Sequence, residues 1–357
     1  LFSRGFIKTG LGKRIAYNLI AAFGSSSLRL AYALALSDLI LAPATPSNTA
    51  RVGGVIMPIT TSLAKAFGSE PQDGPRKIGS FLMQSIYQVN TITSAMFQTS
   101  MAGNTLVAAL ALQSFGIGIT WGDWAIAAIV PGIIALIIMP YFIYKVYPPE
   151  IKDAREAQTM IREELKGLGK MSFQEWVMLG VFILALVLWA TSQFTHLDAT
   201  TVAFLGISIL LATGVLIWDD VKSEKGAWDT LVWMGTLMGF AGFLSKLGFI
   251  KWATVLVGGY IPEGSWIIAF VIAVLVNTYS HYVFASLTAH ISAMFVAFSA
   301  IAISAGAPPM LTLLMIAFTS NLCMSLTHYA AGPSPVIFNT GYVPQNTWWK
   351  LGFFSSV

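Results

Sequence analysis

The sequence predicts an all-α integral membrane protein that consists of two related halves joined by a charged linker. Three observations support this fold class. The 357 residues are 56% hydrophobic and only 10% charged, with a mean hydropathy of +0.72, whereas soluble domains carry about 25% charged residues. Apolar runs recur along the chain at the length of about 20 residues that one membrane crossing needs. Two polar motifs also occur twice, at nearly the same separation.

The apolar runs predict the membrane helices in order. Several runs are short or interrupted, a feature that transporters use to place broken helices at the membrane midplane. They cover roughly residues 28–46, 53–68, 80–98, 103–118, 122–147, 174–193, 198–218, 229–247, 252–280, 283–303 and 309–328.

The composition excludes several classes of protein. The net charge of +4 at pH 7 comes from loops and span ends, with no basic block of the kind that binds nucleic acid. The sequence has no P-loop, no Gly-x-Ser-x-Gly elbow, no dinucleotide fingerprint and no paired acids for catalysis. We therefore expect neither an enzyme nor an ATP-driven pump, and we expect no cofactor and no nucleic-acid partner.

Cysteine and histidine are sparse. Cys323 is the single cysteine and sits in an apolar stretch, so it can form no internal disulfide and is expected to be a small packing residue. The four histidines are scattered and show no metal-ligand spacing. The sequence therefore predicts no metal site.

A polar segment, residues 148–175, divides the chain into a first half, 1–147, and a second half, 176–357. Acidic and basic residues occur in it at helical spacing, as at Glu163 and Lys166, which predicts a surface helix. Its lysines and arginines favour the cytoplasmic side. Because the chain begins at Leu1 and stops at Val357 inside an apparent span, we expect it to be a piece of a longer carrier.

The two halves share three motifs. Lys-Thr-Gly-Leu-Gly-Lys at 8–13 corresponds to Lys-Leu-Gly-Phe-Ile-Lys at 246–251, and Ser-Asn-Thr-Ala-Arg at 47–51 corresponds to Ser-Leu-Thr-Ala-His at 286–290. The offsets are 238 and 239 residues, so the spacing agrees to within one residue. A small-residue loop comes after each module, at 100–104 and at 330–335. Such repeats, with interrupted hydrophobic segments at corresponding places, predict a secondary transporter whose substrate site lies between the repeats.

Each serine-containing motif is expected to begin a helix within the membrane. Pro43 and Pro46 restrict the residues before them and so break the preceding helix, and Ser47 and Asn48 are good N-cap residues for a helix that restarts at Thr49. A backbone break at membrane depth must be buried in protein or line a water-filled cavity. The free amide groups and the positive dipole end of such a helix start make an anion site.

Two such helix starts, one from each half, can face each other and bind the two carboxylates of one small dianion. Side-chain hydrogen bonds would come from Ser47, Asn48, Thr49, Ser286 and Thr288. Ordinary packing of serine and threonine between helices is the alternative for any one of these residues.

Arg51 and His290 each lie four residues after the motif serine, one turn into the expected helix. An arginine in an apolar span costs about 2.5–3.5 kcal/mol on insertion scales, so we interpret Arg51 as a functional residue that faces the anion. A structural ion pair with Asp38 is the alternative for Arg51, and an interhelical hydrogen bond is the alternative for His290. His281 and His328 have weaker claims to the pocket.

The motifs resemble those of the divalent anion:sodium symporter family. The resemblance rests on Pro-Ser-Asn-Thr-Ala-Arg at 46–51, Phe-Ala-Ser-Leu-Thr-Ala-His at 284–290, and Ala-Ala-Gly-Pro-Ser-Pro at 330–335 together with Gly-Tyr at 341–342. It extends over nearly the whole chain. The sequence looks most similar to the bacterial citrate:succinate and tartrate:succinate antiporters and to the plastid 2-oxoglutarate/malate translocators.

This resemblance implies two inverted repeats with re-entrant helical hairpins in an elevator-type homodimer in lipid, where a transport domain carries the substrate past a fixed scaffold. Residues 1–26 then correspond to the second arm of the first hairpin and the adjoining segment. Residues 229–251 correspond to the second hairpin, where Gly235, Gly239 and Gly242 permit close packing. On this resemblance we expect that the family's first spans, the first arm of its first hairpin and its last span are missing from this chain. The implied substrate-binding residues are Ser47, Asn48, Thr49, Arg51, Asn104, Ser286, Thr288, His290, Gly332, Pro333 and Ser334.

The resemblance also bears on sodium, because the sodium-coupled members carry Ser-Asn-Thr in both repeats and bind sodium beside the substrate. This chain keeps Ser-Asn-Thr at 47–49 but has Leu287 in place of the second asparagine, and a leucine offers sodium no oxygen. We therefore expect sodium-independent exchange of small di- or tricarboxylates, of the malate, succinate, 2-oxoglutarate, citrate or tartrate type. Arg51 and His290 would serve as fixed cations in place of the missing ions.

A sodium-coupled dicarboxylate symporter is the alternative within the same fold. It would bind sodium through Ser47, Asn48 and Ser100. The bacterial inner membrane is the expected location, and the plastid inner envelope is the alternative.

Overall fold

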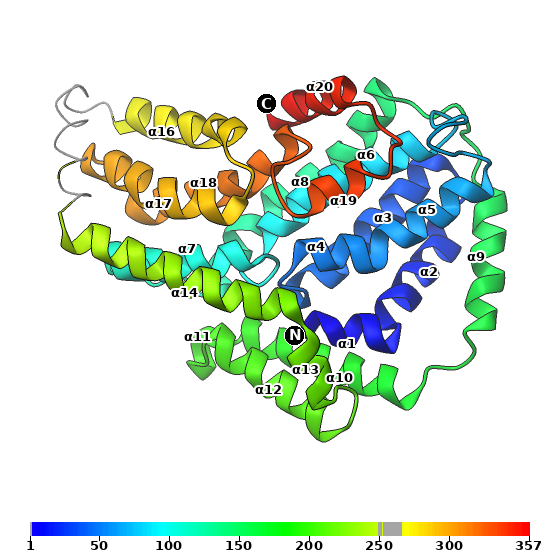
Figure 1. The fold of residues 1–357 in the computed structure, drawn as a ribbon, viewed down its shortest axis with the longest axis horizontal. Coiled ribbons are helices and arrows are strands. Elements are labelled where there is room, and N and C mark those ends of the chain that lie inside the picture. Colours follow the sequence, from blue (N-terminus) through cyan, green and yellow to red (C-terminus); the bar gives the residue numbers. More distant parts are fainter. Residues whose placement is uncertain (1, 249–251, 253–265) are drawn as a thin grey trace.

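The computed structural model describes residues 2–248, 252 and 266–357, which form helices joined by turns (Figure 1). Among these residues no strand forms, and an isolated bridge joins Ser26 to Asp153. Segments long and apolar enough to cross a membrane are Ser27–Ala44, Trp121–Val146, Phe173–Ala190, Trp266–Val283, Leu287–Ser304 and Pro309–Leu326. The prediction of an all-α membrane protein is confirmed.

The helices succeed one another in two series separated by α9 (Arg155–Gly167). The first series is α1 (Phe2–Thr9), α2 (Leu11–Phe23), α3 (Ser27–Leu41), η1 (Ala42–Ala44), α4 (Asn48–Arg51), η2 (Val52–Ile56), α5 (Met57–Ala66), α6 (Gly79–Met96), α7 (Ala102–Phe115) and α8 (Trp121–Val146). The second is α10 (Phe173–Ala190), α11 (Ser192–Thr195), α12 (Ala199–Ala212), α13 (Trp218–Ser223), α14 (Lys225–Lys246), α16 (Trp266–Ser280), η3 (His281–Val283), α17 (Leu287–Ser304), α18 (Pro309–Leu322), η4 (Cys323–Leu326), α19 (Pro333–Phe338) and α20 (Gln345–Ser356).

The predicted break in the first half is present. Helix α3 tightens into the 3-10 turn η1 at Pro43, the chain leaves helical geometry at Thr45, and a new helix begins with Ser47 as its N-cap. From Asn48 the helical run continues without interruption through the π-helical segment η2 and α5. The start of this run is therefore the start of a long helix, with the aligned peptide dipoles that a long helix provides.

The second half repeats this arrangement. Helix α16 passes into the 3-10 turn η3, and Ser286 caps the start of α17. In both halves the 3-10 turn begins five residues before the N-cap serine. The two sequence motifs therefore mark the same local structure in both halves: a helix, a 3-10 turn, an extended serine and a new helix.

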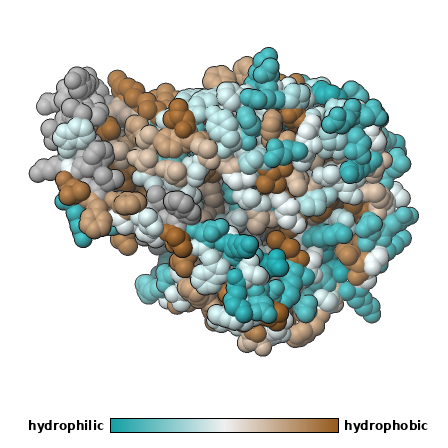
Figure 2. All heavy atoms as spheres, in the orientation of Figure 1, coloured by the Kyte–Doolittle hydropathy of each residue, from teal (hydrophilic) through white to brown (hydrophobic). Residues whose placement is uncertain are grey.

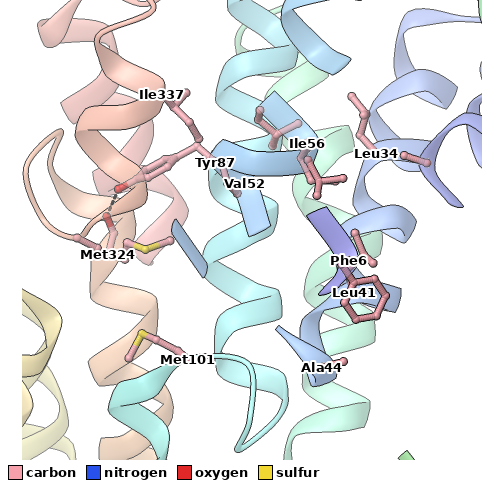
Figure 3. Close-up of a cluster of buried hydrophobic side chains, with 14 of the residues drawn as sticks. Phe6, Leu34, Leu41, Ala44, Val52, Ile56, Tyr87, Met101, Met324 and Ile337 are labelled. Carbon is pink, nitrogen blue, oxygen red and sulfur yellow. Dashed lines mark hydrogen bonds between the residues drawn. The ribbon is translucent and has the colours of Figure 1, made fainter. Parts of the chain in front are cut away.

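Helix α6 lies at the centre of the described structure. All 18 of its residues are buried, and α3, α5, α8 and α18 pack against it. Figure 3 shows part of this core, where Val52 and Ile56 of η2 lie between Leu34 of α3 and Tyr87 of α6. The broken segment of the first half is thus held on both sides by buried helices.

Other helices present apolar side chains to the outside. In α8 only 28% of the membrane-spanning window is buried, and the same share holds for α16. Figure 2 shows hydrophobic atoms gathered over α16, where Ile267, Ile268, Val271 and Ile272 are exposed, and hydrophilic atoms gathered on the opposite side over α9. Apolar surface of this extent is what a lipid bilayer covers.

The charged linker contains the helix that its sequence predicts. Gln158 Nε2 in α9 donates to the carbonyl oxygen of Ala21 at 2.8 Å, near the end of α2, and α9 runs along α2 (Figure 1). At the start of the linker, the Arg155 guanidinium donates hydrogen bonds to Asp153 and lowers the pKa of that carboxyl to about 2. The linker therefore packs on the first half.

The range 229–251, which we expected to hold the second hairpin, is only partly described. Its described part consists of helix α14 up to Lys246 and the turn residues Leu247 and Gly248. Residues 249–251 lie outside the described residues, so a hairpin in this range stays a prediction. A Cβ added at Gly235 or Gly239 meets no atom of the described residues within 4 Å, so close packing at these glycines stays a prediction. The surroundings of Gly242 lie outside the described residues.

Candidate functional site

A cavity of about 700 Å³ lies where the two broken helices meet. Ser47, Asn48 and Thr49 line it from the first half, and Ser286, Leu287 and Thr288 line it from the second. Gly332 of the loop at 330–335 and Met101, Ala102 and Gly103 of the loop at 100–104 also line it. The structure thus brings together six of the residues that we expected in the site: Ser47, Asn48, Thr49, Ser286, Thr288 and Gly332.

The two helix starts have the same capping geometry. Ser47 Oγ accepts the N–H of Ala50 at 3.2 Å, and Ser286 Oγ accepts the N–H of Ala289 at 3.3 Å. Both serines are extended, as N-cap residues usually are. The first N–H groups of each helix have no intrahelical acceptor, and each start carries about half a positive charge from the helix dipole. An anion in this cavity would lie near two such starts.

Arg51 is buried away from the cavity, which differs from the prediction that it faces the anion. Its side chain is 0% exposed and pairs with Asp38, which was the structural alternative for this residue. All five of its N–H groups are used. Nε donates to Asp38 Oδ1 (2.9 Å), Nη1 to the carbonyl oxygens of Thr45 (3.1 Å) and Ser100 (3.0 Å), and Nη2 to Thr93 Oγ1 (3.2 Å) and Ser94 Oγ (3.2 Å). The physical reason is that a buried guanidinium must satisfy all its donors and pair its charge.

Arg51 therefore joins the loops of the first half. Its Nη1 bridges the carbonyl of Thr45, just before the motif, and that of Ser100, in the next small-residue loop. Asn104 has a similar role, because its Nδ2 donates to the carbonyl oxygens of Ser94 at 2.8 Å and Phe97 at 2.9 Å. Asn104 and Ser100 are buried and do not line the cavity, so their contribution is to hold the loop in place.

Asn104 also connects the two halves. Its Oδ1 accepts from Nδ2 of Asn321 at 2.8 Å, and Asn321 lies in α18 just before the break at η4. Neither asparagine is exposed. Asn321 was not among the site residues expected from the sequence, although an asparagine inside an apolar span is a signal that could have identified it.

His290 is also buried and does not line the cavity. Its Nε2 lies 3.1 Å from Ser280 Oγ at the end of α16. This contact matches the interhelical hydrogen bond that was the alternative for His290. His328, which precedes the loop at 330–335 in the chain, does not line the cavity either, and its Nδ1 accepts a hydrogen bond from Trp349 Nε1 at 3.0 Å.

The loop at 330–335 touches the first motif. A Cβ at position 332 would lie 2.2 Å from Thr49 Oγ1, so glycine is needed there for the two loops to meet. Ser334 Oγ accepts the N–H of Ala331 at 3.1 Å and lies 2.8 Å from the Tyr87 hydroxyl. Pro333 and Ser334 are buried and shape this loop rather than line the cavity.

Nine further lining residues belong to no motif and were missed in the sequence. Phe2 and Ser3 come from α1, and Thr200, Ala203, Phe204 and Ile207 come from α12. Glu224 lies between α13 and α14, and Gly226 and Ala227 lie in the first turn of α14. Glu224 is an acidic group in a wall otherwise suited to an anion, and nothing in the sequence marked it.

Six apolar segments among the described residues that can cross a membrane, together with a cavity between two broken helices, define this chain as a polytopic membrane transporter. The family model described as "Sodium:sulfate symporter transmembrane region" matches residues 1–357, and the chain belongs to this family. The family resemblance and the membrane location predicted from the sequence are confirmed, and so is the expectation of a transporter rather than an enzyme.

Several named proteins are similar over most of the chain. "Putative malate transporter YflS" of Bacillus subtilis is 52% identical over 356 residues, which cover 99% of this chain and 74% of that protein. "Dicarboxylate transporter 1, chloroplastic" of Spinacia oleracea is 46% identical over 361 residues, which cover 100% of this chain but only 63% of that protein. "Inner membrane protein YbhI" of Escherichia coli is 44% identical over 351 residues, which cover 98% of this chain and 73% of that protein.

Proposed function

We propose that this chain carries the substrate site of a transporter that exchanges small dicarboxylates across the bacterial inner membrane without sodium. The observation that carries the proposal is the shared cavity, which is lined by one capped helix start from each half. The names of the relatives support this substrate class, because they include a malate transporter and a dicarboxylate transporter. An inner membrane protein of Escherichia coli supports the location.

The geometry favours an anion with a charge at each end. Each helix start carries about half a positive charge and presents backbone N–H groups, and hydroxyl groups of Ser47, Thr49, Ser286 and Thr288 surround them. A single carboxylate would leave one of the two starts unpaired. A cavity of about 700 Å³ accommodates four- or five-carbon dicarboxylates together with water and also admits a tricarboxylate.

Two features support transport without sodium. The carbonyl oxygens of Thr45 and Ser100, in the loops where a sodium ion would bind in the first half, are occupied by the guanidinium of Arg51. In the second half, Leu287 presents only hydrocarbon where a sodium-binding motif has an amide oxygen. A symporter with sodium bound through Ser47, Asn48 and Ser100 is the competing proposal.

Exchange is favoured by the cost of moving an empty site. The pair of Arg51 and Asp38 is formally neutral, so Arg51 adds no net positive charge to the empty carrier. The two helix starts do remain positive and partly desolvated when no anion is bound, which disfavours a return without substrate. A returning dianion removes this penalty. The same proposal includes elevator-type movement of a homodimer, which rests on the resemblance to the family alone.

Proteoliposomes containing the purified full-length protein test the proposal. Uptake of labelled malate is measured with and without internal malate, and with external sodium or choline as the only monovalent cation. We expect uptake that requires internal dicarboxylate and is equal in both cations. Uptake that needs sodium and proceeds into empty vesicles supports the symporter instead, and the absence of any dicarboxylate transport refutes the substrate class.

A further inference from the structure

Three potential metal ligands meet behind the second motif. His281 of η3, His290 of α17 and Cys323 of η4 are all buried, and one ligand atom of each lies within 4.8 Å of the other two. The two imidazole rings are edge to face, with centroids 4.8 Å apart. No metal site was predicted from the sequence, because the spacing patterns of metal ligands describe ligands that lie on one local segment of the chain. Here the fold brings Cys323 from the end of α18 to two histidines that flank Ser286.

Both histidines use one ring nitrogen and leave the other free. His281 Nε2 lies 2.9 Å from the carbonyl oxygen of Ala330, and His290 Nε2 lies 3.1 Å from Ser280 Oγ. The Nδ1 atoms of His281 and His290 are buried and have no hydrogen-bond partner among the described residues. Because a carbonyl oxygen can only accept, Nε2 of His281 carries the proton and its Nδ1 has a free lone pair.

We propose that His281, His290 and Cys323 bind a thiophilic divalent cation such as Zn²⁺. Neutral imidazole and thiolate are the ligands that Zn²⁺ prefers. Histidines that bind a metal usually donate their other N–H to a carbonyl or similar oxygen. His281 Nε2 makes this contact with Ala330, and His290 Nε2 can make it with Ser280 Oγ, whose own proton is donated to the carbonyl oxygen of Asn277. The free Nδ1 atoms are then explained as ligand atoms rather than as unpaired polar groups, which cost about 1–3 kcal/mol each when buried.

Binding requires a small contraction and one deprotonation. Tetrahedral coordination with Zn–N of about 2.0–2.1 Å and Zn–S of about 2.3 Å places the ligand atoms roughly 3.3–3.6 Å apart, so the three side chains move closer than in this structure. Cys323 releases its proton to solvent as the metal binds. Its present contact, from Sγ to the carbonyl oxygen of Ser320 at 3.3 Å, is replaced by the metal–sulfur bond.

The proposed metal site would fix the part of the cavity wall that comes from the second half of the chain. It joins η3, the first turns of α17 and the break after α18, and Ser286 of the cavity lies between the two histidines in the chain. Ala330, which His281 contacts, directly precedes the lining residues Ala331 and Gly332. A bound cation therefore fixes the segments that shape this half of the site and places positive charge behind the start of α17.

Cobalt substitution in the full-length protein tests the metal site directly. The protein is purified in detergent, freed of affinity-tag histidines, stripped of metal with a chelator and titrated with Co²⁺. Thiolate-bound tetrahedral Co²⁺ gives intense visible absorption and a thiolate-to-cobalt charge-transfer band. Because Cys323 is the single cysteine of this chain, a variant of the full protein that retains only this cysteine assigns the band to Cys323. We expect one equivalent of Co²⁺ per chain, displaced by Zn²⁺.

Substitutions at the ligands provide the second readout. Cys323→Ser and His290→Gln should each weaken Co²⁺ binding by at least about 10–100-fold, the loss that results even from altering an outer partner of a metal ligand. His196→Asn is the matched control, because His196 is exposed and its φ of 56° is one that asparagine adopts. The control should bind Co²⁺ like the parent protein.

Two results overturn the proposal. One is a parent protein that shows no saturable Co²⁺ binding with a thiolate band, a result that needs no substitution. The other is Co²⁺ binding that is retained in Cys323→Ser or His290→Gln, provided that the variant elutes as a folded species. These measurements concern binding only, so failure of dicarboxylate transport leaves the metal proposal standing, and the reverse also holds.

Discussion

The guanidinium of Arg51 and the carboxylate of Asp38 form a buried ion pair, with Nε 2.9 Å from Oδ1 and side chains that are 0% and 2% exposed. Asp38 lies in α3, before the break, and Arg51 lies in α4, after it. Asn90 and Thr93 of α6 donate further hydrogen bonds to the carboxylate. The pair therefore holds the two parts of the broken helix together and against α6.

Asp38→Asn should destabilise the protein by about 3–5 kcal/mol, because it leaves the charge of Arg51 buried without its partner. Thermal or denaturant unfolding in detergent measures this. Asp219→Asn is the control, since Asp219 and Lys222 form an exposed pair with side chains 76% and 59% exposed, and such pairs contribute about 0–1 kcal/mol. Equal effects of the two substitutions would contradict the structural role of Asp38.

Arg51→Gln should also destabilise the fold rather than remove only substrate binding. In the double variant Asp38→Asn with Arg51→Gln no unpaired charge remains, so the loss should be smaller than the sum of the single losses by about 0.5–3 kcal/mol. The same unfolding measurement on the four proteins gives this coupling energy. A fully stable Arg51→Gln protein without transport would restore the original interpretation of Arg51 as an anion-binding residue.

Gly332→Ala should impair dicarboxylate binding through a clash between the two loops. The backbone of Gly332 is helical, with φ −53° and ψ −42°, so alanine has no backbone strain there, but its Cβ would lie 2.2 Å from Thr49 Oγ1. Thermal shift by added malate measures the effect. In a Thr49→Ala background the clash is relieved, so adding Gly332→Ala should weaken malate binding only a little further.

Gly180→Ala is the matched control for this substitution. Gly180 lies within α10, and a Cβ added there meets no atom of the described chain within 4 Å. Alanine is also a better helix former than glycine by about 0.8–1.0 kcal/mol. Malate binding by Gly180→Ala should therefore equal that of the parent protein. A Gly332→Ala variant that binds malate equally well would show that the loops separate freely.

The local part of this structure could be predicted from the sequence. Pro43 and Pro46 restrict the backbone, and Ser47 caps the next helix, so the break and restart are determined by residues that are adjacent in the chain. The second motif lacks these prolines. Its agreement with the first, capped by Ser286 in the same way, could be inferred because the motifs repeat at the same spacing.

The direction of the long side chains could not be predicted in the same way. A helix places Ser47 and Arg51 one turn apart, but the orientation of the guanidinium depends on Asp38, Thr93 and Ser94, which come from two other helices. Sequence spacing contains no information on such contacts. An acidic residue in the preceding span was the available signal, and it supported the ion pair that the structure contains.

Two large apolar residues on neighbouring helices differ in exposure, so replacing each by alanine should lower the stability by different amounts. Leu82 of α6 is 0% exposed, whereas Ile134 of α8 is 52% exposed on the surface that we assign to lipid. Leu82→Ala should lower the unfolding free energy by about 2–5 kcal/mol, because it leaves a cavity. Ile134→Ala should have a much smaller effect, because lipid chains fill the space. Comparable losses would place α8 in a protein interface, such as that of a dimer.

The two N-cap serines should have nearly equal effects on substrate binding. A hydroxyl that accepts a backbone N–H still has its own proton to donate, so Ser47 and Ser286 can each donate to one carboxylate of a bound dianion. Hydrogen bonds to charged groups contribute about 1.5–3 kcal/mol. Ser47→Ala and Ser286→Ala should therefore each weaken malate binding by roughly 10–100-fold, as measured by calorimetry or competition with labelled substrate.

Ser172→Ala separates this effect from the loss of a helix cap. Ser172 caps α10 with the same geometry, accepting the N–H of Glu175 at 3.2 Å, but it does not line the cavity. All three substitutions should lower stability by about 0.5–2 kcal/mol, and only those at 47 and 286 should weaken malate binding. A monocarboxylate can bind only one helix start. Its affinity should therefore fall in either Ser47→Ala or Ser286→Ala, and not in both. If malate behaved like the monocarboxylate, the two helix starts would not bind opposite ends of one substrate.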